Sequence, residues 1–186
     1  MSKQLLAICF DFGDTLDDQG TEVKDDTLTT LKAELIPGTA ELLHELKRRG
    51  YRLAIVSNGP VNSIPNVLGQ HGVYDLFEVA AISQRLGVEK PDPRIFRHVL
   101  DRLGISEKDY GRTIMVGNEL AADVAGANGM GMISVWLDWA PRHRKTISSE
   151  LEVPRYTIQA PLALLAVIDD LERQSGNYEL APGGID

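Results

Sequence analysis

The chain lacks several features that would assign it to a class at once. It has one cysteine, Cys9, so no disulfide can form within it, and we expect a reducing compartment, the cytoplasm. It has no apolar run near the roughly 18 residues that span a bilayer, and its start shows no cleavage-site pattern. Its 19 basic residues against 27 acidic ones give a net charge of −8, which disfavours broad binding to nucleic acid or to an anionic membrane. We therefore expect a soluble intracellular protein.

What the chain does contain is enough apolar sequence for one domain. Of its 186 residues, 43% are hydrophobic and 25% are charged. We expect a single domain over residues 1–174. The remaining segment, 175–186, reads "SGNYELAPGGID", is rich in glycine and has no periodicity, so it is predicted to be a flexible C-terminal tail.

Apolar segments alternate with amphipathic ones along this domain. The pattern predicts strands at 5–12, 51–59, 77–82, 112–118, 131–138 and, as an edge strand, 155–161. Helices are predicted at 37–49, 60–70, 93–103, 120–128 and 162–174. Because strands and helices alternate, the sequence predicts an α/β fold of three layers, with helices flanking a mainly parallel sheet.

Polar residues follow the predicted strands, at the edge of the sheet where α/β proteins bind ligands. They form four segments: Asp11–Thr15, Ser57–Gly59, the "EKPDP" segment with Lys90, and Gly117–Asp123. Taken singly, each segment has a structural explanation as a turn, a solvated loop or a helix cap. Asp17 and Asp18, which follow the first segment, are expected to be solvated.

Together, the four segments contain the parts of a phosphoryl-transfer site. Asp11 could serve as a carboxylate nucleophile, and Ser57–Gly59 precede a helix start that suits an anion. Lys90 could neutralise charge on that anion. Asn118 and Asp123 offer the oxygen ligands that Mg²⁺ prefers.

The order and spacing of these segments resemble the four motifs of the haloacid dehalogenase superfamily of hydrolases, which consists mainly of phosphatases. "DFGDTL" resembles the first motif, "VSNG" the second, "EKPDPRIF" the third and "VGNELAADVAGANGMGM" the fourth. The resemblance extends from Leu5 to about Leu171. It implies a Rossmann-like fold and hydrolase activity.

The resemblance also implies a role for each motif residue. Asp11 would attack phosphorus and Lys90 would stabilise the charge that develops. The phosphoryl group and its loop would be held by Ser57, Asn58, Gly59 and Thr15. The cofactor would be Mg²⁺, with ligands from Asp11, the main-chain carbonyl of Gly13, Asn118 and Asp123.

Two positions depart from the family pattern. Gly13 stands where the phosphatases have an aspartate that acts as general acid and base, and Asp14 follows one place later, where its side chain is aimed differently. Asn118 replaces a metal-binding aspartate, so Mg²⁺ binding is expected to be weaker. Whether Asp14 or Glu119 compensates stays open. Substrates with good leaving groups, such as acyl phosphates, would suffer least from the missing acid.

The chain has no room for a full cap domain. Only residues 12–36 are free for an insert after the first motif, and segments below about 40 residues rarely fold alone. We expect a short flap, or minimal cap, at 12–36, which can hold at most a loop and a helix. Relatives without a cap act on large substrates or close their sites by oligomerisation, so the partner could be a phosphorylated small molecule, a macromolecule or a second copy of the chain.

The leading hypothesis is a Mg²⁺-dependent phosphatase that forms an aspartyl-phosphate intermediate and hydrolyses phosphoric esters or acyl phosphates, with activity lowered by Gly13. An alternative is a weak or silent module that binds phosphate-bearing ligands. A hydrolase of carbon–halogen bonds is a third possibility, disfavoured because those enzymes use cap residues that have no place here.

Overall fold

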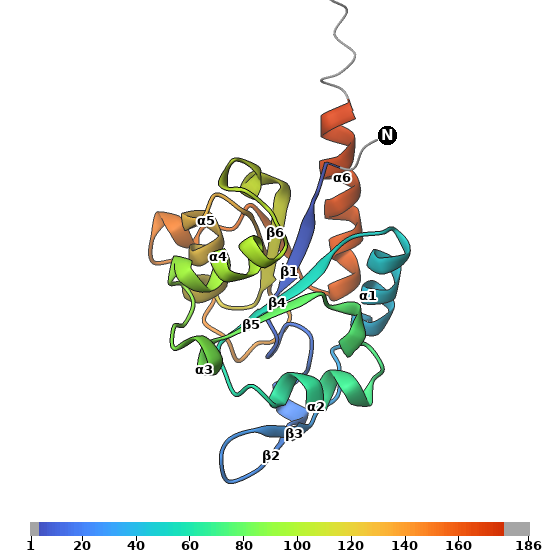
Figure 1. The fold of residues 1–186 in the computed structure, drawn as a ribbon, viewed down its shortest axis with the longest axis vertical. Coiled ribbons are helices and arrows are strands. Elements are labelled where there is room, and N and C mark those ends of the chain that lie inside the picture. The colour runs from blue at the N-terminus through green and yellow to red at the C-terminus, as the bar shows by residue number, and fades with distance from the viewer. Residues whose placement is uncertain (1–3, 177–186) are drawn as a thin grey trace, which may run out of the picture.

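The computed structural model describes residues 4–176 and is built on a six-stranded sheet in the order β5-β4-β1-β6-β7-β8 (Figure 1). Every neighbouring pair of these strands is parallel. The strands are β1 (Ala7–Phe10), β4 (Leu53–Ser57), β5 (Val79–Ile82), β6 (Thr113–Gly117), β7 (Ile133–Leu137) and β8 (Tyr156–Ile158). The predicted mainly parallel α/β fold is confirmed, with β8 at one edge.

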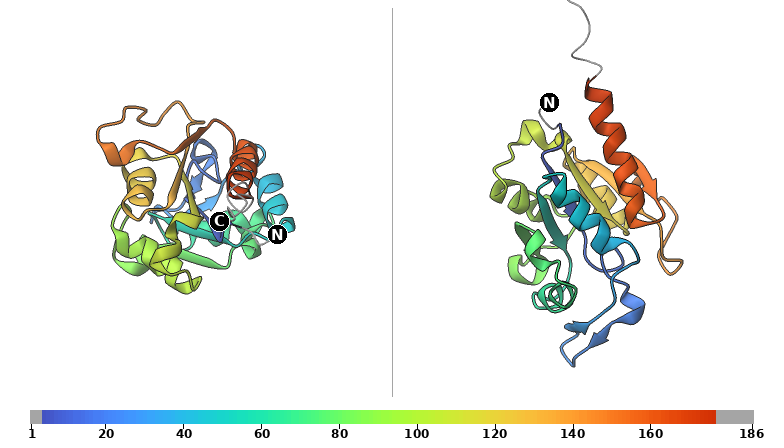
Figure 2. Two further views of the ribbon diagram at one scale, coloured as in Figure 1. Left: turned by 90° about the horizontal axis from the view of Figure 1, so that it is seen from above. Right: turned by 90° about the vertical axis from the view of Figure 1, so that its right-hand side faces the viewer.

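Helices cover both faces of this sheet, which gives the three predicted layers (Figures 1 and 2). The helices are α1 (Thr39–Arg48), α2 (Ser63–Gln70), α3 (Ser83–Leu86), α4 (Pro93–Arg102), α5 (Ala125–Gly129) and α6 (Leu164–Gly176). Helices α1, α2 and α6 pack in one apolar cluster, and α4 and α5 pack in a second. The sheet is therefore buried on both sides, as parallel sheets are.

Strand β1 shows how the alternation of side chains serves both layers. Ile8 and Phe10 belong to the cluster under α1 and α6, whereas Ala7 and Cys9 face α4. Cys9 is fully buried, and this burial raises the pKa of its thiol to about 12. The single cysteine is therefore part of the core and not a reactive thiol.

The segment after β6 differs from the single helix expected at 120–128. Leu120–Val124 form a π-helical turn, and α5 begins only at Ala125. The main-chain N–H groups of Asp123 and Val124 both donate to Glu119 O, at 2.8 and 3.3 Å, which widens the turn. Widened turns of this kind are frequent at functional sites. Here the turn carries the buried Asp123.

Residues 12–36 form a flap that holds a β-hairpin of β2 (Val23–Lys24) and β3 (Thr30–Lys32), so the expectation of at most a loop and a helix is wrong. The hairpin projects beyond the carboxyl ends of the sheet strands (Figures 1 and 2). It is tied to α2, because Thr30 N donates to Ser63 Oγ at 2.9 Å and Asn66 Nδ2 donates to Thr30 O at 3.0 Å. The short insert is thus fastened to the body of the fold.

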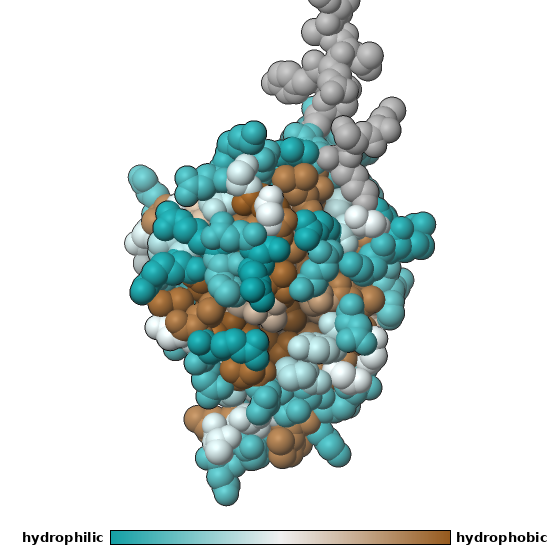
Figure 3. All heavy atoms as spheres, viewed as in Figure 1, coloured by the Kyte–Doolittle hydropathy of each residue, from teal (hydrophilic) through white to brown (hydrophobic). Residues whose placement is uncertain are grey.

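The flap is unusual in what it exposes and what it buries. Its exposed apolar side chains include Val23, Leu28 and Leu31, and Figure 3 shows apolar residues at the surface of this lower end of the molecule. Asp17, in contrast, is fully buried, so the expectation that it is solvated is wrong. Gly13 and Leu35 pair with its main chain, which draws the residue inward.

The C-terminal helix runs slightly further than the sequence indicates. Helix α6 continues to Gly176, so the first two residues of the predicted tail are helical. The rest of that tail, residues 177–186, lies outside the described residues. Between residues 4 and 176, no helix combines the length and the apolar character needed to cross a bilayer.

Candidate active site

Three of the predicted residues form a buried ion triad at the carboxyl edge of the sheet. Lys90 Nζ donates to Asp11 Oδ1 and to Asp123 Oδ1, both at 2.6 Å. The three side chains are 2, 10 and 1% exposed, respectively. Residues that lie 33 and 79 positions from Lys90 therefore meet in one site.

The triad carries more negative than positive charge. Burial opposes the charged form of Lys90, yet the carboxylates of Asp11 and Asp123 raise the pKa of its ammonium. Burial, with a further contribution from Asp11, raises the pKa of Asp123, which Lys90 opposes. When both aspartates are ionised, one ammonium leaves one negative charge uncompensated, and an additional positive charge beside the triad would be favourable.

Thr15 and Asn118 lie at the other oxygen of Asp11. The Thr15 hydroxyl is 3.3 Å from Asp11 Oδ2 and also 3.3 Å from the Asn118 side-chain amide. The two oxygens of Asp11 are thus held from two sides, with Lys90 at Oδ1 and Thr15 at Oδ2. Such restraint fixes the direction in which the carboxylate can react.

The segment Ser57–Gly59 lies beside Lys90, but two of its residues are engaged with the protein. Asn58 Oδ1 accepts from Lys90 N at 2.8 Å, and Asn58 Nδ2 donates to Lys90 O at 3.3 Å. Gly59 N donates to Ser83 Oγ at 3.0 Å. Asn58 therefore positions the main chain of Lys90. Ser57, at the end of β4, is buried at the same edge of the sheet.

The space above Gly13 is filled by the side chain of Gln19. A Cβ atom at residue 13 would lie 2.3 Å from Gln19 Nε2 and 2.9 Å from Gln19 Cδ. Any side chain at residue 13 must therefore displace Gln19, which is exposed and can move. An amide donates and accepts hydrogen bonds but does not transfer a proton at neutral pH, so Gln19 does not replace the missing acid.

Asp14 is buried and fully engaged. Its carboxylate accepts from Arg142 Nε at 2.8 Å, from Gln19 N at 3.1 Å and from His143 Nε2 at 2.5 Å. Burial favours the neutral form, but the hydrogen bonds from Arg142, His143 and Gln19 hold the pKa of Asp14 below its usual value. Asp14 therefore stays ionised and does not supply a proton.

Glu119 does not add a carboxylate to the site either. Its side chain is exposed, whereas its main-chain N–H donates to Asp123 Oδ2 at 2.9 Å. Asp123 thus has one oxygen on Lys90 and the other on Glu119. The main chain of the fourth motif is further fixed by Trp136, whose Nε1 donates to Asn118 O at 2.9 Å.

The loop after β7 contributes groups that the four motifs do not contain. Trp139 Nε1 donates to Asp14 O at 2.9 Å, and Arg142 and His143 reach the Asp14 carboxylate. Sequence reasoning missed Arg142, His143 and Gln19. The sequence does contain a signal for Arg142 and His143. Their segment, "DWAPRHRK", follows a strand whose carboxyl end lies at the same edge of the sheet as those of β1 and β6.

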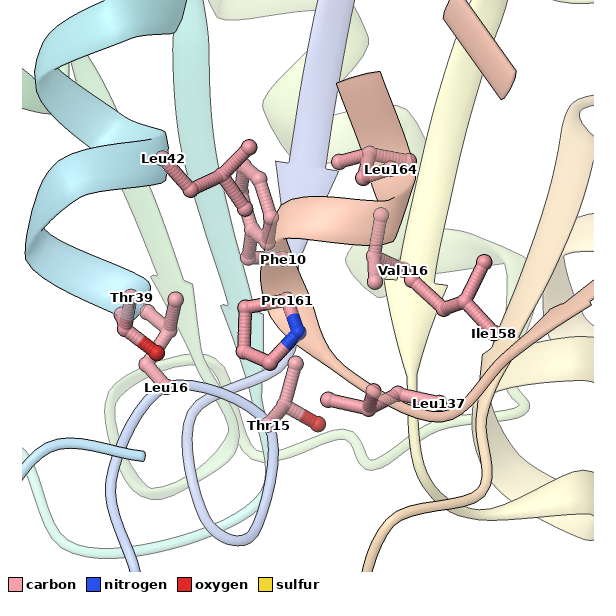
Figure 4. Close-up of a pocket in the computed structure, with 10 residues that line it drawn as sticks. All are labelled: Phe10, Thr15, Leu16, Thr39, Leu42, Val116, Leu137, Ile158, Pro161 and Leu164. Carbon is pink, nitrogen blue, oxygen red and sulfur yellow. The ribbon is translucent and has the colours of Figure 1, made fainter. Parts of the chain in front are cut away.

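A small cavity behind the first motif is apolar and separate in character from this site (Figure 4). It lies between α1, α6 and the sheet, and only the hydroxyls of Thr15 and Thr39 bring polar side-chain atoms to its wall. No charged side chain lines it. A phosphorylated ligand would find no partner for its charge there.

Oxygen atoms suited to a hard cation converge at Asp11. The Asn118 amide atom nearest the first loop lies 3.1 Å from Asp11 Oδ2 and 3.2 Å from Gly13 O. Among the described residues, no three His, Cys, Asp or Glu side chains are arranged to hold a metal, so a cation here depends on this carbonyl and this amide. The donor set fits Mg²⁺ when Asn118 presents its oxygen.

Comparison with known proteins agrees with the geometry. A model of haloacid dehalogenase-like hydrolases matches residues 7–131. The glyceraldehyde 3-phosphate phosphatase of Pyrococcus furiosus is 32% identical over 143 residues, which cover 76% of this chain and 56% of that protein. The phosphoserine phosphatase of Thermus thermophilus is 36% identical over 104 residues, 56% of this chain and 41% of that protein.

A solved structure shows the same arrangement of strands and helices. The haloacid dehalogenase phosphatase of Thermococcus onnurineus superposes with a TM-score of 0.63 at 29% identity, over 73% of this chain and 59% of that one. The chain spans about half the length of the curated relatives it matches. With a family model covering most of the chain and all four motif segments at one edge of the sheet, this protein belongs to the haloacid dehalogenase-like hydrolases.

Proposed function

We propose that the chain is a phosphatase-type hydrolase that acts through a covalent intermediate on Asp11. The observation that carries this proposal is the nearly buried Asp11 carboxylate, which lies 2.6 Å from the Lys90 ammonium at the sheet edge where open α/β sheets bind ligands. Phosphatases among the relatives support a phosphorylated compound as substrate.

The reaction would proceed in two displacements. An oxygen of Asp11 bonds to phosphorus while the bond from phosphorus to the leaving-group oxygen breaks, and the electron pair departs with that oxygen. Water then attacks the aspartyl phosphate and releases inorganic phosphate and free Asp11. Lys90 stays on the carboxylate throughout, and Ser57 offers its hydroxyl to the phosphoryl oxygens.

Magnesium would be held by Asp11, the carbonyl of Gly13 and the amide oxygen of Asn118. Its contribution, when bound, is to neutralise the charge of the phosphoryl group. Asp123 supports the site through Lys90, since both of its oxygens accept hydrogen bonds from the protein.

The preferred substrates are those whose leaving group needs no protonation. Gly13 supplies no acid, Asp14 is held as a carboxylate, and Gln19 cannot donate a proton. General acid catalysis typically contributes about 10²–10⁴-fold, a factor that an acyl phosphate can forgo because a carboxylate leaves unaided. We therefore propose acyl phosphates as the better substrates and alkyl phosphates as slow ones.

The test compares acetyl phosphate with 4-nitrophenyl phosphate and glyceraldehyde 3-phosphate at millimolar Mg²⁺, with Asp11→Asn as the matched control. We expect phosphate release from acetyl phosphate that Asp11→Asn abolishes. Equal rates in the wild type and Asp11→Asn would remove Asp11 from the reaction and overturn the proposal.

A second candidate function is a module that binds phosphate-bearing ligands without turnover. It is favoured by Gln19, whose side chain fills the space of a residue-13 side chain, and by the amide at residue 118. This candidate requires that the wild type binds a phosphorylated ligand and hydrolyses none. Any turnover that depends on Asp11 excludes it.

A further inference from the structure

The orientation of the Asn118 amide decides which of its atoms faces the candidate cation site. A half-turn exchanges the two ends of an amide, and hydrogen bonding selects between the results. With the nitrogen toward the first loop, it donates to Gly13 O at 3.2 Å and Asp11 Oδ2 at 3.1 Å, while Oδ1 accepts from His143 Nε2 at 3.0 Å. With the oxygen toward the loop, its lone pairs face those of Asp11 Oδ2 and Gly13 O, and the Thr15 hydroxyl at 3.3 Å is the donor that it meets there.

His143 carries the proton that makes this choice. Its Nε2 lies 2.5 Å from Asp14 Oδ2 and 3.0 Å from the Asn118 amide. Asp14 is fully buried beside Arg142 and accepts hydrogen bonds as a carboxylate. If Nε2 carried no hydrogen, its lone pair would face a lone pair of Asp14 Oδ2, so Nε2 is the ring nitrogen that carries the hydrogen. The single hydrogen of Nε2 is shared between Asp14 Oδ2 and Asn118, so Nε2 can donate to an oxygen of Asn118 but cannot accept from its nitrogen.

We propose that the Asp14–His143 pair is a positioning device that turns the Asn118 amide away from its metal-ligating orientation. The amide nitrogen satisfies Asp11 and Gly13 by hydrogen bonds at the point where a cation would join them. Mg²⁺ must reverse the amide and break its bond from His143 before Asn118 can offer its oxygen. The affinity of the site for Mg²⁺ is thus set by a residue outside the four motifs.

Most residues that donate a hydrogen bond to a metal ligand have the opposite role. Such residues usually aim the ligand at the metal, and their removal typically weakens metal binding by about 10–100-fold. Here, removal of the His143 donor frees the amide to turn. The net value of one hydrogen bond corresponds to binding of Mg²⁺ that is tighter by about 2- to 10-fold. The two roles therefore predict effects of opposite sign.

The test is calorimetric titration of the full chain with Mg²⁺ in the absence of substrate. His143→Ala is expected to bind Mg²⁺ about 2- to 10-fold more tightly than the wild type. His143→Gln, whose amide nitrogen can donate from the position of Nε2, is expected to return to the wild-type affinity. His44→Ala, an exposed histidine on α1, is the matched control and should change nothing. Circular dichroism verifies that each variant is folded.

A second comparison separates orientation from general loosening of the loop. In an Asn118→Asp background, a carboxylate offers oxygen whichever way it turns, so His143→Ala should bring no gain in Mg²⁺ affinity. Weaker or unchanged binding by His143→Ala alone, an equal gain in both backgrounds, or no binding by any variant would each overturn the inference. It rests on the proposed function only in placing the cation at Asp11, and a chain that hydrolyses nothing still answers this titration.

Discussion

Asp17 is expected to lower the stability of the folded protein as pH rises. Its side chain is fully buried, and neither of its oxygens has a hydrogen-bond partner within residues 4–176. Burial raises the pKa of Asp17 to about 8, and the nearby carboxylates of Glu22, Asp11 and Asp14 add to the shift. Asp17→Asn keeps the shape of the side chain and removes its ionisation.

The sign follows from which state binds the proton. Between the unfolded pKa of 3.8 and the folded pKa of about 8, the folded chain keeps the Asp17 proton and the unfolded chain loses it. The free energy of unfolding therefore falls as pH rises through this range, by about 1.4 kcal/mol per pH unit. At pH 7 this amounts to about 4 kcal/mol relative to pH 4, and Asp17→Asn should recover roughly 2–4 kcal/mol of it.

Urea unfolding followed by circular dichroism at pH 5, 6, 7 and 8 measures this dependence. The stability gained by Asp17→Asn over the wild type should grow with pH and level off above about pH 8. The exposed Asp26 of the same flap provides the matched control, and Asp26→Asn should leave the pH dependence as it is in the wild type. A gain from Asp17→Asn that is constant from pH 5 to pH 8 would refute the reasoning.

Two further changes test the triad and the first motif. Lys90→Met leaves Asp11 and Asp123 buried without their shared partner. We expect thermal unfolding to show a free energy of unfolding that is lower by about 3 kcal/mol or more, and we expect phosphate release to be lost. A variant as stable as the wild type would contradict this prediction. The aspartate of Gly13→Asp must push Gln19 aside, so the double variant Gly13→Asp with Gln19→Ala is expected to hydrolyse 4-nitrophenyl phosphate faster than Gly13→Asp alone. Steady-state kinetics measures the two rates, and Gln19→Ala alone is the control. Equal rates would show that Gln19 does not obstruct residue 13.

Much of the fold could be predicted because each strand and helix has its own local pattern. The all-apolar strand β1 and the cap of α4, where Asp92 accepts from Arg94 N ahead of an apolar stripe, are examples. The π-helical turn at Leu120–Val124 could not be predicted from periodicity. The turn carries Asp123, whose carboxylate accepts from Lys90 in a distant part of the chain and from the main chain of Glu119 four residues earlier.

The site shows the same division between local and distant causes. Asp11, Lys90 and Asp123 could be placed together because the carboxyl ends of parallel strands share one edge. The burial of Asp17 could not be foreseen, since a run of acids after a strand is typical of a solvated turn. His143 was missed because it lies outside the four motif segments, although its loop follows a strand that ends at the same edge of the sheet.

The departures at residues 13 and 118 are connected through the side chains around them. Gln19 occupies the space that Gly13 leaves, and its main-chain N–H donates to Asp14. Asp14 in turn accepts from His143, which meets the amide of Asn118. The effects of substitutions at residues that are linked by hydrogen bonds in this way are not additive.

Restoring the family residue at position 13 or 118 alone therefore leaves its neighbours arranged for the residue that was removed. Gly13→Asp must move the exposed side chain of Gln19. Asn118→Asp meets a His143 donor that a carboxylate can accept without turning, but it sets a carboxylate oxygen about 3.1 Å from Asp11 Oδ2, a repulsion that a bound cation would relieve. Restoring residue 13 is therefore coupled to the position of Gln19, and restoring residue 118 is coupled to the binding of Mg²⁺.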